Sequence, residues 1–182
     1  MGRAIGLLEL NNITQGYQAA DKMLKASNVQ ILEATSVCPG KFIIIVAGDV
    51  GAVKSSLDSA VNICTGSLID KHIIPNVHEG VFPAISGTST VKSIKALGII
   101  ETYSVVSAII AGDTAIKAAQ IELIEIRLAR GMGGKALITM TGDVGAVTSA
   151  VEAGSNAVLK SGLLADKLVI PSPHKDLHSK IM

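Results

Sequence analysis

One cysteine of this sequence lies where a thiol could do chemistry. Cys38 is followed by Pro39, Gly40 and Lys41, residues that predict a loop between two strands. A thiolate at such a place is a nucleophile and a ligand for soft metal ions. The second cysteine, Cys64, is expected in a helix as a small buried side chain, and the sequence has no Cys-x-x-Cys pair. A single chain therefore offers one candidate thiolate ligand, and an inert loop thiol is the alternative.

The sequence that carries this cysteine is duplicated. The hexapeptide Gly-Asp-Val-Gly-Ala-Val occurs at residues 48–53 and again at 142–147. Further residues recur 92 to 96 positions later: Gly6, Glu9, Asp21 and Lys25 as Gly98, Glu101, Asp113 and Lys117, and Gly66, Asp70, Pro75 and His78 as Gly162, Asp166, Pro171 and His174. Two copies of domain length indicate a fused pair rather than a solenoid, which needs at least three short repeats. We expect a first domain at 1–80, a turn-rich linker at 81–95 and a second domain at 96–182.

Each half has the pattern strand, helix, strand, strand, helix, strand. In the first half, apolar runs and their periodicity predict strands at 5–10, 29–37, 41–46 and 68–74, with one helix at 13–26 and another that starts after Asp49. The second half repeats this order. It is the order of a ferredoxin-like α+β unit, in which helices cover one face of an antiparallel sheet. After His174 we expect a polar, frayed tail.

The composition argues against several classes of function. The formal net charge is +1 in 182 residues, and no basic run is dense enough to follow a phosphate backbone, which argues against nucleic-acid binding. A chain that is 48% hydrophobic, with a mean hydropathy of +0.49, favours an aliphatic core and self-association. Its apolar runs are too short for membrane helices, and we expect no secretory signal. Two cysteines at unmatched positions suggest no disulfide framework, which favours the cytoplasm.

The repeated motifs resemble those of a known family. Gly-Ile-Ile-Glu-Thr at 98–102, Ala-Gly-Asp at 111–113, both hexapeptides and the Ile-Pro pairs before His78 and His174 are similar to the shell (BMC) domain of bacterial microcompartments. The resemblance covers nearly the whole of both halves. A fused pair of this kind resembles the tandem shell proteins of propanediol-utilising compartments, of which three chains form a pseudohexameric tile with a central opening.

The resemblance implies a cofactor. Tandem shell proteins of this kind carry an iron–sulfur cluster on the trimer axis, and residues on a three-fold axis meet their own copies. We therefore expect Cys38 of three chains to ligate three irons of a [4Fe–4S] cluster, with the fourth iron left for an outside ligand. Alignment on the Gly-Lys pair that ends each loop places Met132 opposite Cys38, so the second half supplies no thiolate. The expected pore loops contain Pro39, Gly40, Lys41, Gly131, Met132, Gly133, Gly134 and Lys135.

The resemblance also implies residues at the edge of the tile. Two match the family's edge lysine, and two histidines follow the Ile-Pro pairs in the same setting in both halves, which favours an assembly role over catalysis. These residues are Lys25, Lys117, His78 and His174. The family commonly has arginine between this proline and histidine, where the chain has Asn76 and Ser172. We expect other shell proteins as neighbours, through contacts that differ from the family pattern.

Three other motifs have simpler interpretations. Asp49 and Asp143 precede helices, and we expect them to cap these helices rather than to act in catalysis. Arg130 and the glycines after it lack the Walker pattern, which favours a pore loop over a phosphate-binding loop. No nucleophile, base and orienting group form a recognisable arrangement, so we expect no enzyme.

Three functions follow from these patterns. The first is a structural tile of a microcompartment shell in the cytoplasm, with a cluster at Cys38 that moves electrons, or is itself passed, across the shell. Its partners would be two further copies, other shell proteins and a redox protein on one side of the shell. The second is a tile with a gated metabolite pore and an unmetallated Cys38. The third is a duplicated ferredoxin-like sensor that binds a small ligand between its halves.

Overall fold

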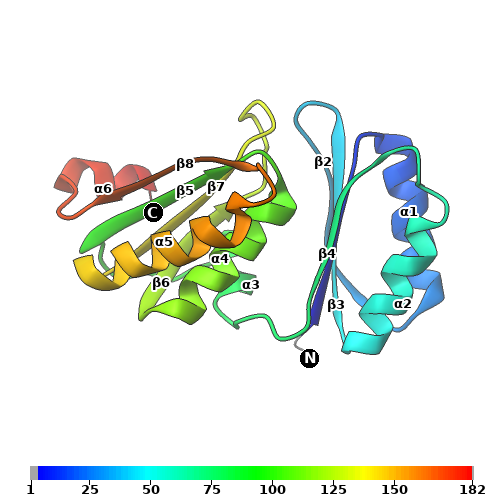
Figure 1. Cartoon of the computed structure of the whole chain (residues 1–182), viewed down its shortest axis with the longest axis horizontal. Helices are drawn as coiled ribbons and strands as arrows, with labels where there is room; N and C mark the ends of the chain where they lie inside the picture. Colours follow the sequence, from blue (N-terminus) through cyan, green and yellow to red (C-terminus); the bar gives the residue numbers. More distant parts are fainter. Residues whose placement is uncertain (1–3, 182) are drawn as a thin grey trace. The chain divides into compact units, whose positions relative to one another are not determined.

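A four-stranded antiparallel sheet forms the centre of each half of the chain (Figure 1). The computed structural model describes residues 4–181, and the chain divides into two compact units between Val77 and His78. Among the described residues, no helix has the length and apolar character needed to cross a bilayer.

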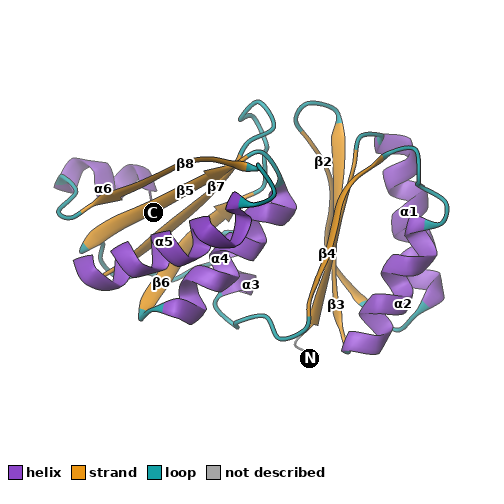
Figure 2. Ribbon diagram, viewed as in Figure 1, coloured by secondary structure: helices purple, strands orange, loops and turns teal. Residues whose placement is uncertain are grey.

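The first unit has the predicted order of elements. In chain order these are β1 (Ala4–Leu10), α1 (Ile13–Ala26), β2 (Gln30–Val37), β3 (Lys41–Gly48), α2 (Val50–Val61) and β4 (Leu68–Ile74). The sheet has the strand order β2-β3-β1-β4, with every neighbouring pair antiparallel. Helices α1 and α2 lie side by side on one face of it (Figure 2). The predicted ferredoxin-like α+β fold is thus confirmed.

The second unit repeats this order and adds a short helix at each end. Its elements are α3 (Val81–Ser86), β5 (Ala96–Thr102), α4 (Val105–Ala118), β6 (Ile121–Arg127), β7 (Ala136–Gly142), α5 (Val144–Leu159), β8 (Leu164–Ile170) and α6 (Lys175–Ile181). The strand order is β6-β7-β5-β8, again antiparallel throughout.

Two segments differ from the sequence-based expectation. The expected linker at 81–95 is not a free connection, because Val81 and Ala84 of α3 are buried and α3 packs on α4 and β6. The tail expected to fray after His174 forms helix α6, whose Ile181 packs against an apolar cluster that includes Ile94. In both cases a few apolar side chains fix a short segment on the second unit.

Small residues bring the helices close to the sheets. In the first unit, alternate side chains of β1 and β3 meet α1 and α2 in a core that includes Leu8, Phe42 and Ile44. A Cβ at Gly6, on the central strand β1, would lie 2.7 Å from Val53 Cγ1 of α2, and a Cβ at Gly98 would lie at the same distance from Val147 Cγ1. Only glycine permits this approach, which explains why it recurs in both halves.

The caps of the helices differ from the prediction. Asp49 and Asp143 occupy the N-cap positions of α2 and α5, but neither side chain makes a capping hydrogen bond. The Asp143 carboxylate instead accepts a hydrogen bond from Lys95 Nζ at 2.9 Å. The side chains that do cap are Asn12, which accepts from the amide of Gln15 in α1, and Ser104 at the start of α4.

The two units pack different side chains where the first helix contacts the sheet. A Cβ at Gly16 of α1 would lie 2.3 Å from Cγ of the buried Phe42, whose ring also contacts Tyr17 at a centroid distance of 4.8 Å. The equivalent residues of the second unit are Ala108 and Ala136, both fully buried. The pair of glycine and phenylalanine in the first unit thus corresponds to two alanines in the second.

The substitution Gly16→Ala should lower the free energy of unfolding by about 1–3 kcal/mol, because the new methyl group overlaps the Phe42 ring. Gly51→Ala is the matched control, since a Cβ at Gly51 of α2 meets nothing within 4 Å. This control should be neutral or stabilising by up to about 1 kcal/mol. Denaturant unfolding followed by circular dichroism measures both, and equal midpoints for the two variants would contradict the packing described here.

Candidate functional site

The loop that carries Cys38 is a tight turn between β2 and β3. Val37 and Lys41 are paired across the two strands, so that only Cys38, Pro39 and Gly40 form the turn. Gly40 has a φ of 74°, and a Cβ there would meet nothing within 4 Å. Cys38 carries a free thiol and is half-buried. The structure therefore places Cys38 in the loop predicted for it, where a ligand from outside the chain can approach.

Lys41 fixes the end of this turn to the central strand. Its Nζ donates a hydrogen bond to Glu9 Oε1 at 3.0 Å, and the side chains are 18% and 1% exposed. Glu9 lies on β1, the strand that pairs with both β3 and β4. A carboxylate buried to this extent needs a compensating cation, so Lys41 is held beside β1 rather than extended into solvent.

The equivalent loop of the second unit is longer and rich in glycine. It connects Arg127 of β6 to Ala136 of β7. Four residues in it have a positive φ: Ala129 at 44°, Gly131 at 71°, Gly133 at 61° and Gly134 at 89°. Met132, the residue opposite Cys38, is half-buried, and its carbonyl accepts a hydrogen bond from the Lys135 amide at 3.1 Å. This loop has no cysteine.

Lys135 repeats the anchoring contact of Lys41 in a more exposed form. Its Nζ donates to Glu101 Oε2 at 3.1 Å and lies 5.9 Å from the centroid of the Tyr103 ring. The hydrogen bond to Glu101 raises the pKa of Lys135. A lysine whose pKa is raised on folding stabilises the fold fully below about pH 10, and this contribution is lost as the pH rises through the folded pKa. The ion pair that anchors the loop of the second unit is therefore present at physiological pH.

The described part of one chain does not form a complete metal site by itself. Among residues 4–181, no three histidine, cysteine, aspartate or glutamate side chains gather in a group able to hold a metal ion. Cys64 lies just after the end of α2, not within it as predicted, and is almost fully buried. Burial raises the pKa of the Cys64 thiol, which disfavours its thiolate form.

The predicted edge residues lie on equivalent elements but in different surroundings. Lys25 of α1 pairs with Asp21 at 2.7 Å, and both side chains are largely exposed. Lys117 of α4 pairs with Asp113 at 2.6 Å, where the Asp113 side chain is only 7% exposed. His78 comes next to this second pair, because its amide donates to Asp113 Oδ1 at 2.8 Å.

His174 has the same local conformation as His78 but a more exposed setting. The Nδ1 atom of each histidine accepts the amide of the residue two positions later, at 3.1 Å from Gly80 and 3.3 Å from Asp176. The His174 side chain is 80% exposed. The two turns are thus alike in backbone and unlike in what surrounds them.

Sequence reasoning noted the recurrence of three acidic residues but assigned them no role. Glu9, Glu101 and Asp113 are the carboxylates that hold Lys41, Lys135 and the turn at His78. Their recurrence 92 residues apart was the available signal. Their partners are 32 to 35 residues away in the chain, a separation that only the fold closes.

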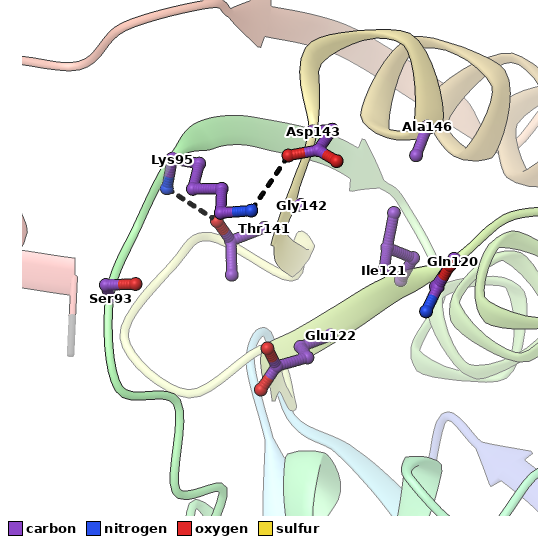
Figure 3. A pocket seen from close by; sticks show the side chains of 9 residues that line it. All are labelled: Ser93, Lys95, Gln120, Ile121, Glu122, Thr141, Gly142, Asp143 and Ala146. Atoms are coloured by element: carbon purple, nitrogen blue, oxygen red, sulfur yellow. Dashed lines mark hydrogen bonds and ion pairs between the residues drawn. The ribbon is translucent and has the colours of Figure 1, made fainter.

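A polar pocket of the second unit contains none of the predicted site residues (Figure 3). Its volume is ≈ 330 Å³, and it lies beside the start of α5. Lys95 donates its amide to Thr141 Oγ1 and its Nζ to Asp143, and Thr141 donates to the Ala96 carbonyl. Lys95, Thr141 and Asp143 are thus hydrogen-bonded within the pocket wall.

The family of the chain follows from the duplicated fold and its sequence. A model of the BMC domain matches residues 4–77 and again residues 96–173. These ranges contain the two sheets and the helices α1, α2, α4 and α5. The chain therefore belongs to the BMC domain family, with two such domains in tandem, and is a bacterial microcompartment shell protein. The family resemblance and the location in a microcompartment shell, both expected from the motifs, are confirmed.

Particular relatives resemble either the whole chain or one half. The bacterial microcompartment shell protein PduT of Citrobacter freundii is 42% identical over 177 residues, which cover 97% of this chain and 96% of that protein. The shell protein EutM of Salmonella typhimurium is 39% identical over 84 residues, which cover 46% of this chain and 85% of that protein.

Two solved structures are similar over most of the chain. A microcompartment protein from Desulfitobacterium hafniense has a TM-score of 0.91 and 50% identity, covering 97% of this chain and 98% of that one. A fused permuted hexameric shell protein of the RMM microcompartment has a TM-score of 0.64 and 20% identity, covering 86% and 81%, and shares the fold. These similarities favour a shell tile over the small-ligand sensor.

The substitution Lys41→Met should lower the free energy of unfolding by about 3 kcal/mol, because it leaves the buried Glu9 carboxylate without this cation. Lys135→Met is the matched control in the second unit. It should cost much less, since Lys135 and Glu101 are 40% and 32% exposed and water can replace the lost partner. Urea unfolding at neutral pH measures the difference, and a smaller effect for Lys41→Met than for Lys135→Met would refute this assignment.

Proposed function

We propose that this chain is a structural, non-enzymatic shell tile in which three copies close around an axis and bind one [4Fe–4S] cluster through Cys38. The cluster would carry electrons, or be handed on, across the shell. One observation carries the proposal: the turn between β2 and β3 presents a single free, half-buried thiol, and the equivalent loop of the second domain has Met132 instead. The similarity to the shell protein PduT over nearly the whole chain supports the role of a shell tile.

The number of ligands supports assembly of several chains around the cluster. An iron–sulfur cluster requires several thiolates, and one chain supplies one accessible thiol. A closed ring of three copies brings three Cys38 thiols to one point and leaves one iron for an outside ligand. Gly40 has no side chain to crowd this point, and its open surroundings are compatible with a bulky group beside the turn.

The residues around the thiol would orient it without competing as ligands. Lys41 is turned toward Glu9, which neutralises its charge and keeps its amine away from the turn. Because Val37 and Lys41 are paired, the chain leaves β2 and enters β3 at fixed points on either side of Cys38. The chemistry supplied by the bound cluster is one-electron transfer, and the role of this chain is to hold it, shield it and seat the tile among its neighbours.

Other shell proteins are the expected neighbours of the tile. Lys25 and Lys117 lie near the C-terminal ends of α1 and α4, each held by an aspartate one turn earlier. With Asn76 and Ser172 in place of the family's arginine, the contacts between tiles would depend more on these lysines and on the neighbouring proteins. A redox protein on one side of the shell would complete the electron path.

A gated metabolite pore without a cluster is the second candidate. The observation in its favour is the loop between β6 and β7, where four residues with positive φ include three glycines. Such a segment can adopt alternative conformations at low cost. In this case Cys38 would line the pore as a free thiol.

The substitution Cys38→Ser should abolish iron and acid-labile sulfide binding after anaerobic reconstitution, with loss of the brown colour and no change in native mass. Wild-type protein should hold one cluster per three chains. Cys64→Ala is the matched control and should retain the cluster, because Cys64 is buried. Colourless, iron-free wild-type protein would exclude the cluster and leave the metabolite pore, and a native particle that is not a trimer would exclude the arrangement around an axis.

A further inference from the structure

The two domains differ most clearly at the surface formed by the first helix and the edge strand. In the second domain, His78–Ser86 covers this surface, with α3 against α4 and β6 (Figure 1). In the first domain the equivalent surface, on α1 and β2, is exposed. We call these the covered surface and the open surface.

The open surface has an aspartate–lysine pair at the position equivalent to that of the covered surface. Asp113 of the covered surface accepts the His78 amide and pairs with Lys117. Its equivalent on the open surface is Asp21, which pairs with Lys25 but has a side chain that is 60% exposed. The carboxylate is therefore in place, and among the described residues of the first unit its hydrogen-bond partner is the Lys25 amine rather than a backbone amide.

The apolar part of the open surface is also exposed. Helix α1 presents Ile13 at 38%, Tyr17 at 64% and Leu24 at 44% exposure. At the first two positions α4 has Val105 and Ile109, both fully buried. Three large apolar side chains along one short helix form a patch of the kind that marks an interaction site.

The chain contains a second copy of the segment that covers such a surface. His174 recurs 96 positions after His78, within the motif Ile-Pro-x-x-His. The His78 carbonyl accepts the Val81 amide at 3.0 Å, and the His174 carbonyl accepts the Leu177 amide at 2.9 Å. Leu177 is 39% exposed, whereas Val81 is fully buried. The second segment thus has the docking conformation and an undocked apolar side chain.

We propose that the turn His174–Leu177 of one chain docks on the open surface of the next chain, with the His174 amide donating to Asp21. The segment after the first domain docks on a second domain. By analogy, the segment after the second domain would dock on a first domain. No further domain follows it in this sequence, so this first domain belongs to another copy of the chain. Contacts of this head-to-tail kind close into rings when the rotation permits.

This inference rests on the proposed ring of three chains and adds the contact that would close it. One position differs between the two segments. A Cβ at Gly80 would lie 2.8 Å from Ile116 Cδ1, and the equivalent residues are Asp176 and Leu24. The contact would be made by the far end of a flexible side chain, which can shift to admit the Asp176 side chain.

Cross-linking tests the contact directly. A Leu24→Cys/Asp176→Cys double variant, treated with a short bismaleimide reagent, should give covalent dimers and trimers on a denaturing gel. All variants carry Cys38→Ser, so that converging Cys38 thiols cannot react with the reagent. The single variants Leu24→Cys and Asp176→Cys in this background are the controls and should give far less. Cross-linking no greater than in the single variants, or only within one chain, would overturn the proposal.

Substitutions at Asp21 test the hydrogen bond. Asp21→Ala should weaken association about tenfold or more in sedimentation equilibrium, because an ionised acceptor is lost. Asp21→Asn keeps an oxygen acceptor and should associate more tightly than Asp21→Ala. Association of Asp21→Ala equal to that of wild type would refute the contact.

These results are independent of the cluster. Iron-free wild-type protein, together with cross-linking of the Leu24→Cys/Asp176→Cys variant, would remove the cluster proposal and keep this contact. A wild-type trimer that holds a cluster, with a double variant that fails to cross-link, would keep the cluster proposal and remove this contact.

Discussion

In both domains a lysine at the loop end of one strand binds a glutamate on the central strand. Lys41 is held by Glu9 and Lys135 by Glu101. This strand, β1 or β5, is hydrogen-bonded to a neighbour on each side, so each ion pair ties a loop to an inner strand of the sheet. The position of Cys38 depends on this contact, because the turn that carries it ends at Lys41. In the first domain the pair is buried and the turn is short, and in the second the pair is more exposed and the loop is longer.

The elements that depend on local pattern could be predicted from the sequence. The helix expected at 13–26 and the strand expected from residue 41 agree with α1 and β3, because their periodicity and β-branched content are decisive. The duplication then supplied the second domain and made the family resemblance specific. The caps could not be predicted correctly: Asp143 has a suitable side chain, but Lys95 competes for its carboxylate, and this partner is 48 residues away.

The candidate site was predictable only in part. The turn at Cys38 follows from its proline and glycine, and the absence of a matching thiol follows from the alignment of the halves. The contacts that hold the turn could not be read from the sequence, because they join residues that only the antiparallel sheet brings together. The short helices α3 and α6 were missed for a similar reason, since each is fixed by a few apolar side chains on a distant surface.

The covalent link between the domains has a consequence for assembly. The segment that begins at His78 continues directly from the first domain and packs on elements of the second. A tethered group meets its binding surface at an effective concentration in roughly the millimolar range, whatever the dilution of the protein. In the fused chain this packing therefore forms during folding and does not depend on expression level. Separate single-domain shell proteins would have to form the same contact by collision.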